Sequence, residues 1–265
     1  MEPPHGSPAP VRASAPGWRD LAGGGAAVIL GRDEPPRRGR RRPAHGILIL
    51  PFDVRDDDAL AAATAAAIAW RGGVDLAVAN AGISQRSIAL QTSMAVYRQI
   101  IEVDLIAQIA FAQGLIGHMA ERGSGRLAFV SSIAGKVGVP VRTAYCAAKF
   151  GLVGYAGALR AELSQTGVHV HVIYPGSVAT DVSRNALTAD GSTRGKSDAA
   201  IDQGIPADEA AASMVDAMLA GQREIIVARG MEEAMGEMRR TPDALLDQVA
   251  AMVAAGYIER MEADG

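Results

Sequence analysis

Short, continuously apolar segments alternate with longer helical patterns along most of this chain, and this alternation restricts its possible folds more than any other feature. The apolar segments lie at residues 26–30, 46–52, 75–80, 126–132, 168–174 and 224–228. The helical patterns lie at 56–71, 91–121, 143–165, 206–220 and 230–260. Strands that are apolar on both faces are typical of a parallel sheet buried on both sides. The sequence therefore predicts an α/β fold with a doubly wound parallel sheet and helices on both faces.

The chain has 265 residues, of which 49% are hydrophobic and 21% charged, so it can fold as one globular domain. Residues 1–25 are rich in proline, glycine and alanine, and no strand is expected there. Residues 35–43 hold three prolines and five arginines where a helix should connect two strands. We therefore expect an irregular N-terminal segment over 1–25 and a single domain over 26–265, with a mobile substrate loop at 183–206.

The net charge and the cysteine content limit which binding partners and which cellular compartment are expected. A formal net charge of −3 provides no general attraction to nucleic acid or anionic membranes. No apolar run approaches the roughly 18 residues that span a bilayer, and the first residues lack the layout of a secretory signal. Cys146 is the only cysteine, so no internal disulfide can form. These features predict a cytoplasmic protein with no membrane partner, and the five histidines show no spacing for a metal site.

The arginines of residues 35–43 raise the question of nucleic-acid binding. They are flanked by proline, and no aromatic residue lies among them. We interpret them as a solvated loop and expect no nucleic-acid partner, with a basic nucleic-acid surface as the alternative.

Tyr145 and Lys149 lie four residues apart near the start of the predicted helix 143–165. At this spacing two side chains share one helix face, so the ammonium lies near the phenol. A neighbouring positive charge favours the phenolate and lowers a pKa that is ordinarily about 10. Ser132 ends the preceding strand, and its hydroxyl can hold an oxygen atom that Tyr145 protonates. Taken alone, the pair also fits a chance spacing.

Three further motifs follow successive strands: ANAG at 79–82, VSS at 130–132 and PGSVAT at 175–180. Together with Tyr145 and Lys149 they resemble the short-chain dehydrogenase/reductase family, in order, from about residue 26 to 228. The stretches RTAYCAAK, ALRAEL and NALTADGSTRG are most similar to the dehydrogenase/reductase member 7B-like branch. The resemblance implies a Rossmann-type fold. It also implies an oxidoreductase that transfers a hydride between NAD(P) and a small-molecule carbonyl or secondary alcohol.

The resemblance also implies a role for each site residue. Tyr145 is the catalytic acid and base, Lys149 lowers its pKa and hydrogen-bonds the nicotinamide ribose, and Ser132 orients the substrate oxygen. The implied cofactor-binding residues are Asp53, Val54, Asn80, Ala81, Gly82, Tyr145, Lys149, Val178 and Thr180. Of these, Asp53 accepts from the adenine amino group, and Val178 and Thr180 contact the nicotinamide end.

Arg32 follows the second strand of the family pattern and bears on the choice of cofactor. A guanidinium at this place pairs with the 2′-phosphate of NADP, whereas an acidic residue selects the bare ribose of NAD. Although Asp33 follows directly, we favour NADP as the cofactor because of Arg32, with NAD as the alternative. The structural alternatives are an ordinary turn for Asn80 and Gly82, a helix cap for Asp53 and Thr180, and a surface charge for Arg32.

Asp104 marks the first departure from the family pattern, in the helix that follows ANAG. Family members usually carry asparagine there, in a proton relay through water to the lysine. An ionised carboxylate accepts hydrogen bonds but cannot donate them. It can also pair with Lys149 and weaken the effect of the ammonium on Tyr145. A slower or pH-shifted relay is the mild consequence, and loss of turnover is the severe one.

The second departure is the absence of T-G-x-x-x-G-x-G, the motif that brings the cofactor pyrophosphate to backbone amides. The nearest register sets residues 11–18 against it and places Arg12, Pro16 and Trp18 at the glycine positions. A damaged reading frame or a rebuilt N-terminus would each explain this. We therefore expect a degenerate first strand and phosphate loop. The alternative function is a catalytically impaired scaffold of the same fold that binds cofactor weakly or not at all.

Relatives of this family commonly pair through the long helices that correspond to 91–121 and 143–165. The resemblance therefore implies a homodimer or homotetramer. Substrate recognition is expected in the loop 183–206 and around residues 138–142, where no motif identifies the substrate.

Overall fold

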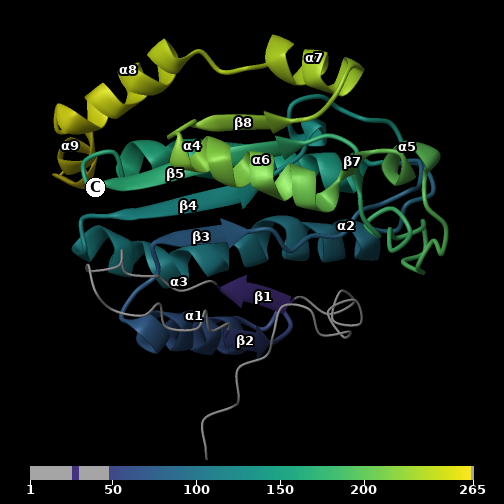
Figure 1. Ribbon diagram of the computed structural model, residues 1–265, viewed down its shortest axis with the longest axis horizontal. Coiled ribbons are helices and arrows are strands. Elements are labelled where there is room, and N and C mark those ends of the chain that lie inside the picture. Colours follow the sequence, from purple (N-terminus) through teal and green to yellow (C-terminus); the bar gives the residue numbers. More distant parts are fainter. Residues whose placement is uncertain (1–25, 30–47, 264–265) are drawn as a thin grey trace, which may run out of the picture.

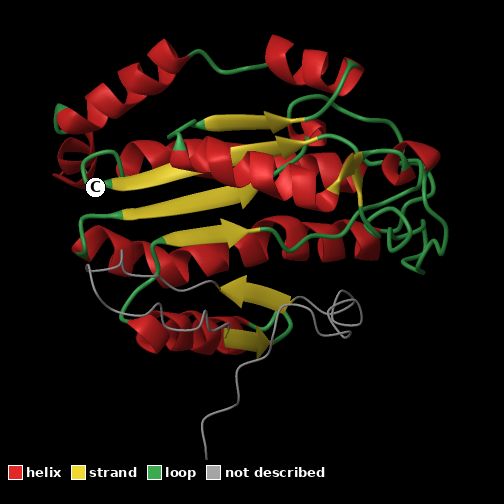
Figure 2. Cartoon of the chain, in the orientation of Figure 1, coloured by secondary structure: helices red, strands yellow, loops and turns green. Residues whose placement is uncertain are grey.

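The computed structural model describes residues 26–29 and 48–263 (Figure 1). Four parallel strands form the main sheet in the order β3-β4-β5-β8. Their bounds are Leu76–Ala79 for β3, Gly125–Val130 for β4, Val168–Pro175 for β5 and Glu224–Val227 for β8. These strands confirm the last four of the six predicted segments. Helices lie on both sides of the sheet (Figure 2), which confirms the Rossmann-type α/β class.

The two sheet faces are covered by different helices. The bounds are Asp57–Arg71 for α1, Ala107–Glu121 for α3, Thr143–Glu162 for α4 and Ala207–Leu219 for α6. Along β4, Leu127 and Phe129 pack with α3 and α4, whereas Ala128 and Val130 pack with α6. Successive side chains of a strand point to opposite faces, so a continuously apolar strand can bury both. The predicted helices at 56–71, 143–165 and 206–220 are confirmed.

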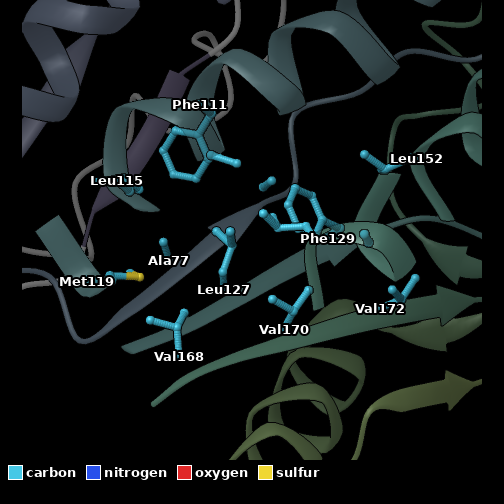
Figure 3. Packing of buried hydrophobic residues seen from close by; sticks show 14 of the residues in the cluster. Ala77, Phe111, Leu115, Met119, Leu127, Phe129, Leu152, Val168, Val170 and Val172 are labelled. Carbon is cyan, nitrogen blue, oxygen red and sulfur yellow. The ribbon is translucent and has the colours of Figure 1, made fainter. Parts of the chain in front are cut away.

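The larger core lies between the sheet and the helices α1, α3 and α4. Figure 3 shows Phe111 and Leu115 of α3 on the side of the helix that faces Leu127 and Phe129 of β4. The Phe129 ring also meets the Tyr155 ring of α4 edge-on, with centroids 5.6 Å apart. Each fully buried side chain of this size contributes about 1.5–3 kcal/mol to folding.

The first two predicted strands do not join the parallel sheet. β1 (Ala26–Ile29) and β2 (Leu48–Pro51) pair with each other in antiparallel fashion, with Val28 opposite Ile49. Among the described residues they form a separate two-stranded sheet. The prediction of a parallel arrangement was wrong for this pair. A parallel pair needs a crossover connection, usually a helix, and the three prolines in residues 35–43 disfavour one.

The predicted helix at 91–121 begins at Met94 and contains one π-helical segment. α2 (Met94–Ile101) continues into a π-helical segment, Glu102–Ile106, and then into α3. Ser93 caps its start by accepting a hydrogen bond from the backbone amide of Val96 at 3.4 Å. π-helical segments inside α-helices are frequent at functional sites, and this one carries Asp104.

This long helix also corrects the expectation about apolar runs. Over its 28 residues, Met94–Glu121 has a window of mean hydropathy 1.5, which makes it long and apolar enough to cross a membrane by length and composition. Of that window, 44% is buried inside the structure. Phe111, Leu115 and Met119 pack into the core of the sheet. A helix that lies in the core of an α/β domain meets the same criterion.

The predicted helix at 230–260 is divided into three. The bounds are Met231–Met238 for α7, Asp243–Ala254 for α8 and Tyr257–Ala263 for α9. Pro242 directly precedes α8 and has no amide hydrogen with which to continue α7. Gly256 separates α8 from α9 and has φ of 80°, in the left-handed region that favours glycine. The single-helix prediction was wrong because it gave too little weight to these two residues.

Candidate active site

The carboxyl ends of β3, β4 and β5 meet at one edge of the sheet and surround a cavity of about 430 Å³. Ser132, Tyr145 and Lys149 all line this cavity. The full lining is Asn80, Gly82, Ile83, Asp104, Val130, Ser131, Ser132, Tyr145, Lys149, Pro175, Gly176, Val178, Thr180, Asp181, Val182, Asn185, Ile201 and Met214. The structure thus brings these three residues and Asp104, the fourth residue predicted to take part in catalysis, to one small space.

Ser132 lies between β4 and a short 3₁₀ turn, Ile133–Gly135. Its backbone is extended, and its hydroxyl oxygen accepts a hydrogen bond from the amide of Ala134 at 3.1 Å. The same hydroxyl donates to the carbonyl oxygen of Pro175 at 3.4 Å. These contacts hold the side chain at the end of the sheet, where a substrate oxygen can exchange for the longer bond.

Tyr145 lies in the first turn of α4 and is half-buried. The start of this helix is anchored by Gln85, a fully buried residue that precedes it by some sixty positions. The Gln85 side-chain oxygen accepts from the Ala144 amide at 2.8 Å, and its nitrogen donates to the hydroxyls of Ser87 and Thr92. Sequence reasoning missed Gln85, since no local pattern distinguishes it from a surface glutamine.

Lys149 lies one turn further along α4 and is buried. Its Nζ lies 5.5 Å from the centroid of the Tyr145 ring, which confirms the predicted proximity. The ammonium donates a hydrogen bond to the carbonyl oxygen of Val130 at 3.0 Å. It also lies 3.2 Å from Oδ2 of Asp104. Lys149 is therefore held in place by the end of β4 on one side and by the π-helical segment on the other.

Asp104 is fully buried, and its predicted pairing with Lys149 is confirmed. Its Oδ1 atom accepts a hydrogen bond from the Ile83 amide at 2.8 Å, so the carboxylate also orders the chain after β3. Gly82 lies directly against this pair. A Cβ atom added to Gly82 would be 3.2 Å from Asp104 Oδ2 and 3.4 Å from Lys149 Nζ, closer than packing comfortably allows.

Burial and pairing shift the pKa values of both charged groups. Burial raises the pKa of Asp104 above its usual value, against the opposing effects of the Lys149 ammonium and the Ile83 amide. Burial alone would lower the pKa of Lys149, but the Asp104 carboxylate and Tyr145 together outweigh burial, and the net shift is upward. We conclude that Lys149 stays charged, with much of its charge offset by Asp104.

The predicted cofactor residues are distributed over two adjoining cavities. Asn80, Gly82, Val178 and Thr180 line the catalytic cavity. Val54, Asn80 and Ala81 line a second, mainly apolar cavity of about 410 Å³ between α3 and α6. The carbonyl oxygen of Ala81 accepts from the Gln108 side chain at 2.6 Å, so its position is fixed. Both cavities therefore hold residues that the family resemblance assigns to the cofactor.

Asp53 is the predicted cofactor residue that the structure describes but places in neither cavity lining. It is exposed, and its carboxylate is hydrogen-bonded by Arg55 Nε at 3.0 Å. The hydrogen bonds from Arg55 lower the pKa of Asp53 to about 2. The helix-cap alternative for Asp53 is wrong, because Asp56 caps α1 by accepting from the Ala59 amide at 3.0 Å.

The remaining predictions concern Thr180, Arg32, the glycine motif and metal binding. The hydroxyl of Thr180 donates to the carbonyl oxygen of Val178 at 3.4 Å, and the next described helix, α5, begins at Ala199, so Thr180 caps no described helix. Arg32 and residues 11–18, which correspond to the glycine motif, lie outside the described residues. Within 26–29 and 48–263, no group of three or more His, Cys, Asp or Glu side chains is placed to bind a metal ion.

Hydrogen bonds to the Asp198 carboxylate hold the loop 183–206 in place. Its carboxylate accepts hydrogen bonds from Arg86 Nε at 2.8 Å, from Arg194 at 2.6 Å and from the Ser183 hydroxyl at 2.9 Å. Although burial opposes ionisation, these hydrogen bonds hold the pKa of Asp198 well below its usual value. The loop also contains α5 (Ala199–Asp202) and β7 (Ile205–Pro206), which pairs with β6 (Val178–Ala179).

We predict that Asp198→Asn loosens this loop without unfolding the domain. The substitution removes the charge that holds two guanidinium groups, and charged hydrogen bonds are each worth about 1.5–3 kcal/mol. Trypsin should therefore cut after Arg184, Arg194 or Lys196 roughly 10- to 100-fold faster than in the unsubstituted chain. The matched control is Asp202→Asn, at an exposed position of α5. Equal cleavage rates in both variants would contradict the assignment.

Comparison with known proteins agrees with this site. A family profile described as short chain dehydrogenase matches residues 19–191. Dehydrogenase/reductase SDR family member 7B of Mus musculus is 36% identical over 183 residues, which cover 69% of this chain and 57% of the mouse protein. The Danio rerio protein of the same name is 33% identical over 177 residues, which cover 67% of this chain and 57% of that protein. The chain therefore spans a little over half the length of these curated relatives.

The fold also has a solved counterpart. A crystal structure of a short-chain dehydrogenase from Streptomyces avermitilis matches with a TM-score of 0.60, at 23% identity and with 80% of each chain covered. This likeness agrees with the Rossmann-type architecture described above. The names of the curated relatives agree with the 7B-like resemblance. Since the profile match covers well over half of the residues, this chain belongs to the short-chain dehydrogenase/reductase family.

Proposed function

We propose that this chain is an NADP-dependent oxidoreductase that interconverts a carbonyl compound and a secondary alcohol. Membership of the family supports an NAD(P)-dependent oxidoreductase in general. The observation that carries the proposal is the convergence of Ser132, Tyr145 and Lys149 on one cavity, with Asn80 and Thr180 in its wall. The preference for NADP over NAD is supported by Arg32, which follows the apolar segment 26–30, the second strand of the family pattern.

The geometry of the cavity supports a separate role for each of the three residues Ser132, Tyr145 and Lys149. When bound, the nicotinamide supplies or accepts the hydride. The Ser132 hydroxyl, released from its 3.4 Å bond to Pro175, orients the substrate oxygen. The Tyr145 phenol gives its proton to that oxygen during reduction and takes it back during oxidation. Lys149 holds the ribose, and its ammonium is paired with the Asp104 carboxylate at 3.2 Å.

A titration tests the proposal. NADPH and NADH are each titrated into the protein, and binding is followed by the fluorescence of the nicotinamide. Turnover of a panel of ketones and aldehydes is then measured by the absorbance of the nicotinamide. Saturable binding with turnover supports the enzyme, and tighter binding of NADPH that Arg32→Ala removes supports the cofactor preference. Absence of binding at millimolar cofactor would overturn the proposal.

A non-catalytic scaffold of the same fold is the second candidate. Two observations favour it: Asp104 offsets the charge of Lys149, and the sequence lacks the glycine motif. A scaffold predicts a folded chain without cofactor binding in the same titration. Restoration of turnover by Asp104→Asn would instead favour a slow enzyme.

We also propose a homodimer or homotetramer in the cytoplasm, with a small-molecule substrate and no nucleic-acid or membrane partner. Ile106, next to the start of α3, and Phe150 on α4 are 42% and 39% exposed, which supports pairing through these helices. A reducing compartment is supported by the single cysteine. Light scattering at micromolar concentration tests the assembly, and a monomer would contradict it.

A further inference from the structure

The helix α7 contacts two loops at the edge of the cavity that Ser132 lines. It begins directly after Gly230, beyond the carboxyl end of β8, and Figure 1 shows it beside that end of the sheet. One of these loops, residues 131–137, carries Ser132. The other, residues 175–180, forms the wall with Pro175, Gly176, Val178 and Thr180. None of the family motifs includes α7.

Glu232, in the first turn of α7, binds the second loop through both carboxylate oxygens. Its Oε2 accepts from the Ser177 amide at 2.7 Å, and its Oε1 accepts from the Ser177 hydroxyl at 3.0 Å. The contact is close, because a Cβ atom on Gly176 would overlap Glu232 Oε2. Two hydrogen bonds from a charged acceptor to one residue fix its orientation as well as its position.

Ser177 and its neighbour Gly176 are also hydrogen-bonded to the adjoining strands. Its carbonyl oxygen accepts from the Ile205 amide at 2.9 Å, and the neighbouring Gly176 amide donates to the Val227 carbonyl at 3.0 Å. Val178, which lines the cavity, follows directly in β6. The wall is thus tied to α7 on one side and to β7 and β8 on the other.

The other end of α7 binds the serine loop. Gly236 packs against Ile133, since a Cβ atom on Gly236 would be 2.9 Å from Ile133 Cδ1. Lys136, at the end of the 3₁₀ turn, donates to the carbonyl oxygen of Arg239 at 2.9 Å. The same ammonium forms a buried ion pair with Glu224 at 2.7 Å. Gly236 and Arg239 lie about one and about two helical turns beyond Glu232.

We propose that α7 is a brace that sets the spacing between Ser132 and the 175–180 wall, and that Glu232 is the positioning residue at its end. This inference rests on the proposed function, in which substrate lies between the two loops. A substrate held between Ser132 and the opposite wall reacts only when both are correctly placed, and small displacements carry large costs in rate.

Hydrogen–deuterium exchange of the whole chain, without ligand, tests the brace independently of catalysis. In Glu232→Ala, amide exchange should rise roughly 10-fold both in residues 175–180 and in residues 131–137, to which Glu232 makes no hydrogen bond in the described part of the chain. Glu232→Gln, which keeps one acceptor oxygen, should show a smaller rise and guards against misfolding of the alanine variant. Glu233→Ala, at the exposed neighbouring position, is the matched control and should show no change. Unchanged exchange in 131–137 in both Glu232 variants would overturn the brace.

Kinetics then test the positioning role. Glu232→Ala should lower kcat about 10- to 100-fold and raise the KM for NADPH, with partial recovery in Glu232→Gln. A fall in kcat no larger than the loss of folded protein, measured on the same samples by circular dichroism, would overturn the positioning role. If the unsubstituted chain shows no turnover while exchange in 131–137 still responds to Glu232→Ala, the brace stands and the proposed function fails.

Discussion

Lys149→Met should destabilise the folded chain by about 3–5 kcal/mol. The Lys149 ammonium lies 3.2 Å from Asp104 Oδ2, and the two side chains are 4% and 0% exposed. Removal of the lysine leaves a carboxylate buried without its counter-charge, which is far costlier than the loss of a surface ion pair. Urea unfolding of the variant and of the unsubstituted chain at neutral pH measures the difference.

A double-mutant cycle isolates the pair. Asp104→Asn keeps an oxygen that can accept from the Ile83 amide, so Lys149→Met combined with Asp104→Asn removes both charges together. The double variant should recover most of the stability lost in the single one, with a coupling of about 2–3 kcal/mol. Lys196→Met, at an exposed position, is the matched control and should change stability by less than about 0.5 kcal/mol. Additive losses would contradict the ion pair.

The loss in Lys149→Met should also depend on pH. Burial raises the pKa of Asp104 in the folded chain, and removal of the ammonium raises it further. Below about pH 4, the ordinary range for aspartate, both states are protonated and the penalty is absent. As the pH rises the unfolded state ionises first, so stability falls until the pH exceeds the raised folded pKa. The deficit should therefore shrink on acidification, and a deficit independent of pH would contradict this origin.

Tyr145→Phe should reduce turnover by about 10²- to 10⁴-fold and leave the fold intact. The substitution removes the hydroxyl that would exchange a proton with the substrate oxygen. Tyr145 is half-buried at the cavity wall, so the ring remains and little packing is lost. The measurements are kcat with a ketone and NADPH, the affinity for NADPH, and the melting temperature.

Tyr257→Phe is the matched control, since Tyr257 lies in α9 and is 41% exposed. It makes the same chemical change far along the chain from the catalytic residues and should leave kcat unchanged. Cofactor affinity should be nearly the same in both variants, because the lost hydroxyl acts on the reacting oxygen. Full turnover in Tyr145→Phe would show that another group moves the proton.

Several features of the site could be predicted because they depend on local spacing. The four strands of the parallel sheet follow from continuous apolar runs, and Ser132, Tyr145 and Lys149 follow from a strand end and from two positions on one helix face. The Asp104–Lys149 contact was predicted from the family pattern and confirmed at 3.2 Å. The contacts of Asp53 did not follow from local spacing. Arg55 hydrogen-bonds its carboxylate, and Asp56 rather than Asp53 caps α1.

The sequence by itself determined the α/β class, the order of the elements and the residues that can carry acid–base chemistry. These properties depend on hydrophobic periodicity and on residue type, both of which can be determined from the sequence alone. Only the tertiary structure decided that β1 and β2 pair with each other, that Gln85 anchors the start of α4, and that Glu232 binds Ser177 across 55 positions. Such contacts join residues far apart in the chain, and no local pattern encodes which distant partners packing brings together.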